Sequence, residues 1–285
     1  MKATSPGRPG LSDSKIWTRL QPVFTPLLTL VVIGVPLWLV VATAGKSRGE
    51  ALQPDLSLPS KWQLWDNLKA VWTDGGIPAG FFGSLLVVIP SVIGVLIVGS
   101  MAAWILARRA SKLTAALYAL AISGIVLPPA VVTLVLLLRQ LGLAGSAVGM
   151  IGVYMGIYLS TVIFFVTGFV RTIPASLEEA AQIDGAGPVK VFVRVVLPLL
   201  RPVLATATIL VCLYVWNDVF YAFFVVGGRL ETLPLNLFQV ASAGLYLNNW
   251  HLIFAYVILM SLPLVVVFAI AQRKIISGIT SGAVK

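Results

Sequence analysis

Cysteine, histidine and charged side chains are scarce in this chain. Its 285 residues include one cysteine, Cys212, and one histidine, His251. Single residues of these types supply neither a disulfide framework nor a set of metal ligands, so we expect no metal site. Charged residues make up 11% of the chain, whereas 59% of it is hydrophobic and the mean hydropathy is +0.98. This composition excludes an ordinary soluble domain and is typical of a membrane protein.

Negative charge is scarcer still. Ten acidic residues stand against 20 lysines and arginines, which gives a formal net charge of +10. A basic balance can indicate nucleic-acid binding. Here the basic residues gather at the ends of apolar runs, so we expect contact with membrane lipid and none with nucleic acid.

Six apolar stretches are long enough to cross a bilayer as helices, which requires about 20 residues each. They are 22–44, 81–107, 114–138, 147–170, 202–226 and 250–271. The sequence therefore predicts an all-α, polytopic membrane protein with six transmembrane helices. A basic tail at 1–21 precedes a single transmembrane domain at 22–285.

The distribution of lysine and arginine predicts the orientation of the spans, because cytoplasmic loops carry an excess of both. If the N-terminus is cytoplasmic, only six of the 20 basic residues lie outside: Lys46, Arg48, Lys61, Lys69, Arg139 and Arg229. We therefore expect both termini, and the polar segment 172–201, on the cytoplasmic side.

That polar segment is the most unusual stretch of the chain. Ser176 and Glu179 have the spacing of a capping box, which predicts a helix beginning near Ser176. Gly185 and Gly187 are suited to end this helix, and Pro188 to begin a second one. The sequence predicts a short helix-turn-helix with small residues at its bend. Lys190, Arg194 and Arg201 fall on one face of the second helix. Such a segment is suited to contact a soluble partner.

The same residues carry a resemblance to a known family. Glu179-Ala180-Ala181, a glycine at 185 and Val195-x-Leu197-Pro198 are similar to the coupling loop of ABC importer permeases, although Val195 stands where isoleucine is commoner. Ile183-Asp184-Gly185-Ala186 resembles the carbohydrate-uptake branch, the maltose and glycerol-phosphate permease type. Trp216-Asn217-Asp218, Gln272-Arg273 and the end of the chain, 278–285, follow in the familiar order.

The resemblance implies a type I ABC importer transmembrane fold and a permease subunit for a sugar or sugar derivative in a bacterial or archaeal inner membrane. It implies a second homologous permease, as a heterodimer, a dimer of ATP-binding cassette ATPases and an extracytoplasmic substrate-binding protein or lipoprotein. ATP and Mg²⁺ then belong to the ATPase, and this chain has no catalytic residue and no cofactor. The residues implied in ATPase coupling are Glu178, Glu179, Ala180, Ala181, Asp184, Gly185, Leu197 and Pro198.

A second group of residues is a candidate lining of the translocation path. Asp218 is the one carboxylate expected at membrane depth, where a charge is costly and often functional. Asn217 precedes it and Tyr214 lies one turn earlier. Pro128 and Pro129 interrupt the third stretch, either as a packing kink or as a cavity-lining element. For Asp218, a structural role and a place in the path both remain open.

Two alternative functions fit the sequence less well. A secondary transporter or channel without an ATPase would show paired ionisable residues within its spans, whereas this chain offers Asp218 alone. A nucleotide site at Gly45-Lys46-Ser47 would require a glycine at position 40, which is Val40. The chain is therefore expected not to be an enzyme, and its energy to come from a partner.

The predicted orientation can be tested by cysteine labelling in a Cys212→Ser background. Ala186→Cys should react with a membrane-impermeant maleimide only from the cytoplasmic side, and Ser57→Cys only from the outside. Reaction of both from the same side would overturn the six-span topology.

Overall fold

The computed structural model describes residues 21–22, 24–127, 129–242 and 249–283, and it describes the side chains of these residues except those of 240 and 270–283. Within these ranges the chain forms helices and turns and no strand. The predicted all-α class is confirmed. The chain divides into two compact units, 1–71 with 246–258 and 72–245 with 259–285. The boundary falls inside the long helix α14 (Trp250–Ala283).

The first unit contains an apolar helix and a tightly bonded loop. A π-helical turn η1 (Leu30–Gly34) leads into α2 (Val35–Ala44), and α3 (Leu64–Asp74) begins in this unit. A short 3₁₀ turn, η2 (Glu50–Leu52), lies between α2 and α3. Asn67 is buried and donates to the carbonyls of Ala44 and Lys46 at 2.8 and 2.9 Å. These bonds connect the end of α2 to α3.

Lys46 has a structural role in this loop. Its side chain is buried, and its Nζ donates to the carboxylate of Asp55 and to the hydroxyl of Ser57. The hydrogen bond from Lys46, followed by those from Ser57, lowers the pKa of Asp55 to about 2. The expectation that Gly45-Lys46-Ser47 is not a nucleotide loop agrees with this arrangement, because the ammonium group is already bound within the loop.

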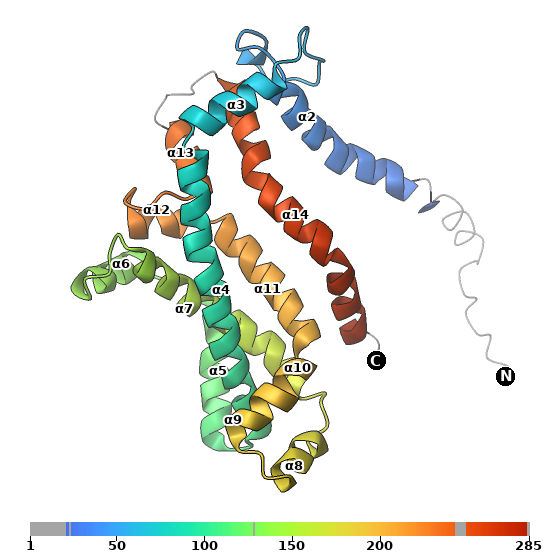
Figure 1. Cartoon of the computed structure of the whole chain (residues 1–285), viewed down its shortest axis with the longest axis vertical. Helices are drawn as coiled ribbons and strands as arrows, with labels where there is room; N and C mark the ends of the chain where they lie inside the picture. Colours follow the sequence, from blue (N-terminus) through green and yellow to red (C-terminus); the bar gives the residue numbers. More distant parts are fainter. Residues whose placement is uncertain (1–20, 23, 128, 243–248, 284–285) are drawn as a thin grey trace, which may run out of the picture. The chain divides into compact units, whose positions relative to one another are not determined.

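The second unit is built around α4 (Ile77–Arg108), which packs mainly against α7 (Ala147–Val170) and also against α11 (Arg201–Trp216). Figure 1 shows α4 extending along the length of this unit, with α5 (Lys112–Val126) beside α7. The remaining helices are short: α6 (Val131–Gln140), α8 (Ser176–Ile183), α9 (Pro188–Val191), α10 (Leu197–Leu199), α12 (Phe220–Val226) and α13 (Leu233–Ser242). A π-helical turn, η3 (Phe192–Val196), connects α9 with α10.

Four helices are long and apolar enough to cross a membrane: Phe24–Ala44, Ile77–Arg108, Ala147–Val170 and Trp250–Ala269. Two bent pairs raise the number to six if each pair is one span, so among the described residues the count is four to six. The predicted stretch 147–170 coincides with α7. The predicted stretch 114–138 is instead divided into α5, which ends at Val126, and α6, which begins at Val131.

The predicted span 202–226 is also interrupted. The α11 helix ends at Trp216 and α12 begins at Phe220, so 217–219 form a break. At its other end α11 meets the 188–199 helical segment at a bend of 77°. Asp218 therefore lies between two helices, and not within one continuous helix as the sequence had suggested.

One contact fixes the first turns of α4 against the loop before α13. A Cβ added to Gly83 would lie 1.8 Å from the carbonyl oxygen of Glu231. The hydroxyl of Ser84 accepts a 3.0 Å bond from the backbone N–H of Leu233. The loop can approach this closely only because residue 83 has no side chain.

Candidate functional site

The predicted coupling loop 172–201 is anchored to the end of α4 through Glu178. Glu178 is 6% exposed. Its Oε1 accepts from Nε of Arg108 at 2.8 Å, and its Oε2 accepts from Nε1 of Trp104 at 2.8 Å. Nη2 of Arg108 lies 2.8 Å from the same Oε1 as an ion pair and donates to the carbonyl of Ile173 at 2.9 Å. A hydrogen bond between a guanidinium and a carboxylate is stronger than one between neutral groups. The pair therefore sets the position of α8.

An aromatic contact supports the same anchor. The rings of Trp104 and Phe192 lie 5.5 Å apart between centroids and are tilted by 38°. Phe192 is buried in η3, so Trp104 contacts the second helical segment with its ring and the first with its N–H. The two halves of the coupling loop thus share one anchor on α4.

In the turn between these halves Gly185 ends α8 as predicted, whereas Gly187 does not: its φ is −68°, and it is the N-cap of α9. Gly185 has φ +81°, in the left-handed region. Its N–H donates to the carbonyl of Gln182 at 3.0 Å, and the N–H of Ala186 donates to that of Ala181 at 2.9 Å. This pair of bonds is the Schellman motif, which ends a helix with a residue at positive φ. Pro188 then occupies the first turn of α9, as expected.

The predicted capping box at the start of α8 is wrong. Ser176 is already helical, the N-cap is Ala175, and no side chain caps it. Ala175 has helical angles, φ −64° and ψ −26°, whereas a capping residue normally has β-region angles. The carbonyl of Ala175 instead accepts from the N–H groups of Glu178 and Glu179 at 2.9 and 3.1 Å.

The opposite face of α8 is open. Glu179, Ala180 and Asp184 are exposed, and Ile183 is 86% exposed. In the part of the chain that the structure describes, neither Glu179 nor Asp184 makes an ion pair. In the second half of the loop Leu197 is half-buried and Pro198 is exposed. The structure thus separates Glu178, which is buried, from its exposed neighbours.

The second group of predicted residues gathers around the break at 217–219. Oδ2 of Asp218 accepts from the hydroxyl of Tyr154 at 2.8 Å and from the N–H of Ala222 at 3.0 Å. Oδ1 accepts from the N–H of Tyr221 at 3.3 Å. Asp218 therefore satisfies backbone donors in the first turn of α12 and connects it to α7. This geometry gives Asp218 a structural role.

Tyrosine rings continue from this carboxylate. Tyr154 and Tyr158 stack at 6.2 Å between centroids, and Tyr158 and Tyr214 stack at 5.6 Å with their planes 6° apart. Tyr214 is 53% exposed, so one face of the stack is open. Asn217 is exposed and its amide donates to the carbonyl of Leu213 at 2.8 Å.

The predicted residues thus form two groups. Glu178, the exposed α8 residues, Leu197 and Pro198 belong to the coupling loop, whereas Tyr214, Asn217 and Asp218 lie beside the tyrosine stack. Pro129 lies in the link between α5 and α6, and Pro128 lies outside the described residues. Sequence reasoning missed Trp104 and Arg108 as partners of Glu178. Their spacing of four, at the end of an apolar helix, was the available signal.

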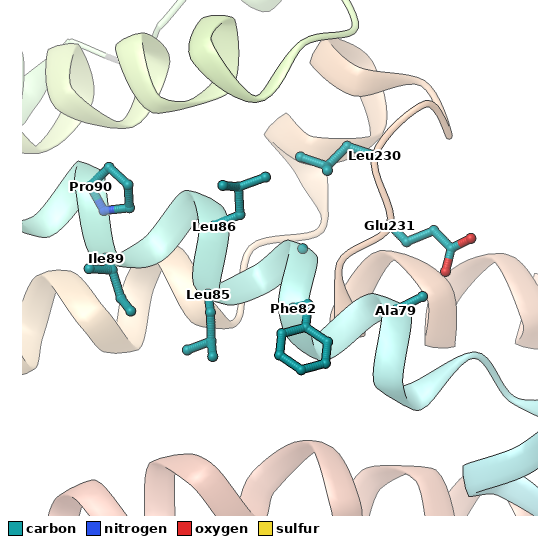
Figure 2. A pocket seen from close by; sticks show the side chains of 9 residues that line it. Ala79, Phe82, Leu85, Leu86, Ile89, Pro90, Leu230 and Glu231 are labelled. Carbon is teal, nitrogen blue, oxygen red and sulfur yellow. The ribbon is translucent and has the colours of Figure 1, made fainter.

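A shallow cavity of about 660 Å³ lies beside the first turns of α4 (Figure 2). Phe82, Leu86, Ile89 and Pro90 line it from α4, and Leu230 and Glu231 line it from the loop before α13. It contains no predicted site residue. Among the described residues no group of three or more His, Cys, Asp or Glu could hold a metal ion.

Comparison with known proteins identifies relatives over most of the chain. Residues 95–281 match the model of the family described as binding-protein-dependent transport system inner membrane component. The melibiose/raffinose/stachyose import permease protein MelC of Bacillus subtilis (strain 168) is 34% identical, over 94% of this chain and 98% of the relative. The diacetylchitobiose uptake system permease protein NgcG of Streptomyces coelicolor (strain ATCC BAA-471 / A3(2) / M145) is 31% identical, over 90% and 85%.

A solved structure agrees with the fold. It is the crystal structure of a bacterial ABC transporter involved in the import of the acidic polysaccharide alginate. One of its chains superposes with a TM-score of 0.77 at 20% identity, over 94% of this chain and 99% of that chain. The resemblance to carbohydrate-uptake permeases, noted from the coupling-loop motif, is confirmed by the family match and by these relatives.

The anchor predicts a difference between two neighbouring glutamates. Glu178→Gln removes the charge opposite the partly buried Arg108, which should destabilise the docked position of α8 by on the order of 3 kcal/mol. Hydrogen–deuterium exchange of 176–183 should therefore increase. The matched control Glu179→Gln, at an exposed position, should leave exchange unchanged. Equal exchange in the two variants would show that the ion pair does not hold α8.

Proposed function

Since this chain belongs to the family of binding-protein-dependent transport system inner membrane components, we propose that it is the transmembrane permease subunit of an ATP-driven importer of a sugar or sugar derivative. Its named relatives transport oligosaccharides, which supports the substrate class. The second candidate, a transporter without an ATPase, is not favoured by any observation made on the described residues.

One observation carries the mechanism: α8 is fixed on its inner side and open on its outer side. Glu178 fixes the helix to Arg108 and Trp104, whereas Glu179 and Ile183 are exposed. A surface fixed to a membrane helix and exposed to the aqueous phase is suited to transmit movement. We infer that an ATPase subunit binds this surface.

The partners and the orientation follow from the same proposal. Two ATPases bind ATP and Mg²⁺, and their closure moves the spans between inward and outward access. A second, homologous permease completes the path, and an extracytoplasmic binding protein delivers the substrate. Six spans with both termini and the coupling loop 172–201 in the cytoplasm agree with the distribution of basic residues.

We further propose that the tyrosine stack borders the substrate path. Aromatic rings present a flat apolar surface, and the C–H face of a sugar ring can pack against such a surface. Tyr214 has the open face, while Asp218 and Tyr154 hold the break that positions it. Asn217, beside Tyr214, supplies an exposed amide for hydroxyl groups.

Gly185→Val should abolish transport while leaving membrane insertion intact. A Cβ at this position meets no atom within 4 Å, so the expected cost is that of a β-branched residue at positive φ, about 1–2 kcal/mol. The strain would displace α8 from the ATPase. Gly187→Ala is the matched control, because its φ is −68° and its Cβ also meets nothing within 4 Å.

The measurement is substrate uptake together with ATPase activity of the complete importer in proteoliposomes. Gly185→Val should either lose the ATPase or hydrolyse ATP without uptake, whereas Gly187→Ala should transport normally. Normal uptake by both Gly185→Val and Glu179→Ala, with the ATPase still bound, would show that α8 does not couple the ATPase to transport.

The path proposal predicts that the ring of Tyr214 matters and its hydroxyl does not. Tyr214→Ala should lower the uptake rate at least tenfold, whereas Tyr214→Phe should retain most of it, because the apolar ring face remains. Both variants should assemble with the ATPase. Unchanged uptake in Tyr214→Ala would place the stack outside the path.

Asp218→Asn should alter uptake while the complex stays assembled, because it weakens the hydrogen bonds that hold the break at 217–219.

A further inference from the structure

An apolar groove of about 510 Å³ lies between the last turns of α4 and the segment from α9 to α11. Residues 96–105 form one wall and residues between Pro188 and Leu204 form the other. Its one hydroxyl, that of Ser100, is bonded to the carbonyl of Ile97 at 3.1 Å. A ligand of this groove must therefore be apolar.

A second cavity adjoins the groove and has a different chemistry. It measures about 370 Å³ and shares Val193, Leu197 and Leu204 with the groove. Arg201 and Thr208 also line it. The hydroxyl of Thr208 is occupied by the carbonyl of Leu204 at 2.7 Å. Arg201 is exposed and makes no ion pair among the described residues. The Arg201 guanidinium in the second cavity is therefore a cation that no carboxylate of the described residues pairs with.

We propose that the two cavities together bind one anionic phospholipid, with an acyl chain in the groove and its phosphate at Arg201. The wall formed by 96–105 is about 14 Å long, at 1.5 Å per helical residue, which suits a segment of an acyl chain. Basic pockets between membrane helices bind anionic headgroups. Lys190 and Arg194, both exposed and on the segment that forms the second wall, add positive potential nearby.

The charge of the second cavity distinguishes this ligand from a protein helix. The groove lies along α4 just before Arg108, at the end of a membrane-spanning helix, so its ligand comes from the bilayer. A helix from another permease would pair with the Arg201 guanidinium only if it carried a carboxylate to this position, whereas every anionic phospholipid carries a phosphate.

The location connects the lipid to the coupling loop. Trp104 lines the groove, and its Nε1 donates to Glu178, the anchor of α8. Phe192, whose ring contacts that of Trp104, lines it too. A chain in the groove therefore packs against the two rings that hold the coupling loop. The lipid site depends on the two cavities and on Arg201, and not on the proposed function.

The test uses the complete importer, purified in nanodiscs that contain equal amounts of phosphatidylglycerol and phosphatidylcholine. Phosphatidylglycerol with a photoactivatable acyl chain should form adducts within 96–105 and 188–204. Native mass spectrometry should show retained phosphatidylglycerol in excess of phosphatidylcholine. Arg201→Gln should lower the retention of phosphatidylglycerol about fivefold, the factor expected for one basic contact.

Two further variants make the test specific. Val193→Trp places a large ring in the shared wall and should displace both lipids, while Arg139→Gln, an exposed arginine on α6 that does not line either cavity, should change neither. Equal retention of the two lipids by the unmodified importer, adducts outside the two walls, or no effect of Arg201→Gln would each overturn the proposal. Retention of phosphatidylglycerol by an unmodified importer that does not transport a sugar would contradict the proposed function and not the lipid site.

Discussion

A carboxylate buried against an apolar helix must find a cation and hydrogen-bond donors, because an isolated charge there is far more costly than a paired one. In this protein that constraint is met by Glu178 with Arg108 and Trp104. The pair fixes α8 to the end of α4. Since α4 also packs against α7 and α11, the polar segment outside the apolar helices is connected to the central helices of its unit through one side-chain cluster.

Local signals in the sequence were sufficient for some elements and not for others. The 147–170 span, the turn at Gly185 and the start of α9 at Pro188 depend on hydrophobicity and backbone preferences of neighbouring residues, and they were predicted. The Glu178–Arg108 pair joins residues 70 positions apart, and no periodicity reports such a contact. The capping box failed because backbone carbonyls before Ser176 already accept the first N–H groups of α8.

Asp218 shows why an apolar run does not reveal a break in a helix. Hydropathy treats 202–226 as one stretch, since two polar positions, Asn217 and Asp218, do not lower its average enough. The helix nevertheless ends at Trp216, and a new one, α12, begins at Phe220. The carboxylate of Asp218 accepts hydrogen bonds from the first N–H groups of α12. The sequence left two roles open for this residue. Its occupied oxygens explain the structural one, while the neighbouring Tyr214 has the exposed surface.

The contact between Gly83 and the carbonyl of Glu231 divides α4 into two ends with different freedom. If the helix rotated about its axis at residue 83, the Cβ of another residue would meet that carbonyl. The contact therefore restricts rotation at this end of α4. At Arg108 the helix is held by long, flexible side chains that tolerate small displacements. A tilt of α4 that kept this contact would pivot near Gly83, and its amplitude would grow along the helix and be largest where α8 is attached.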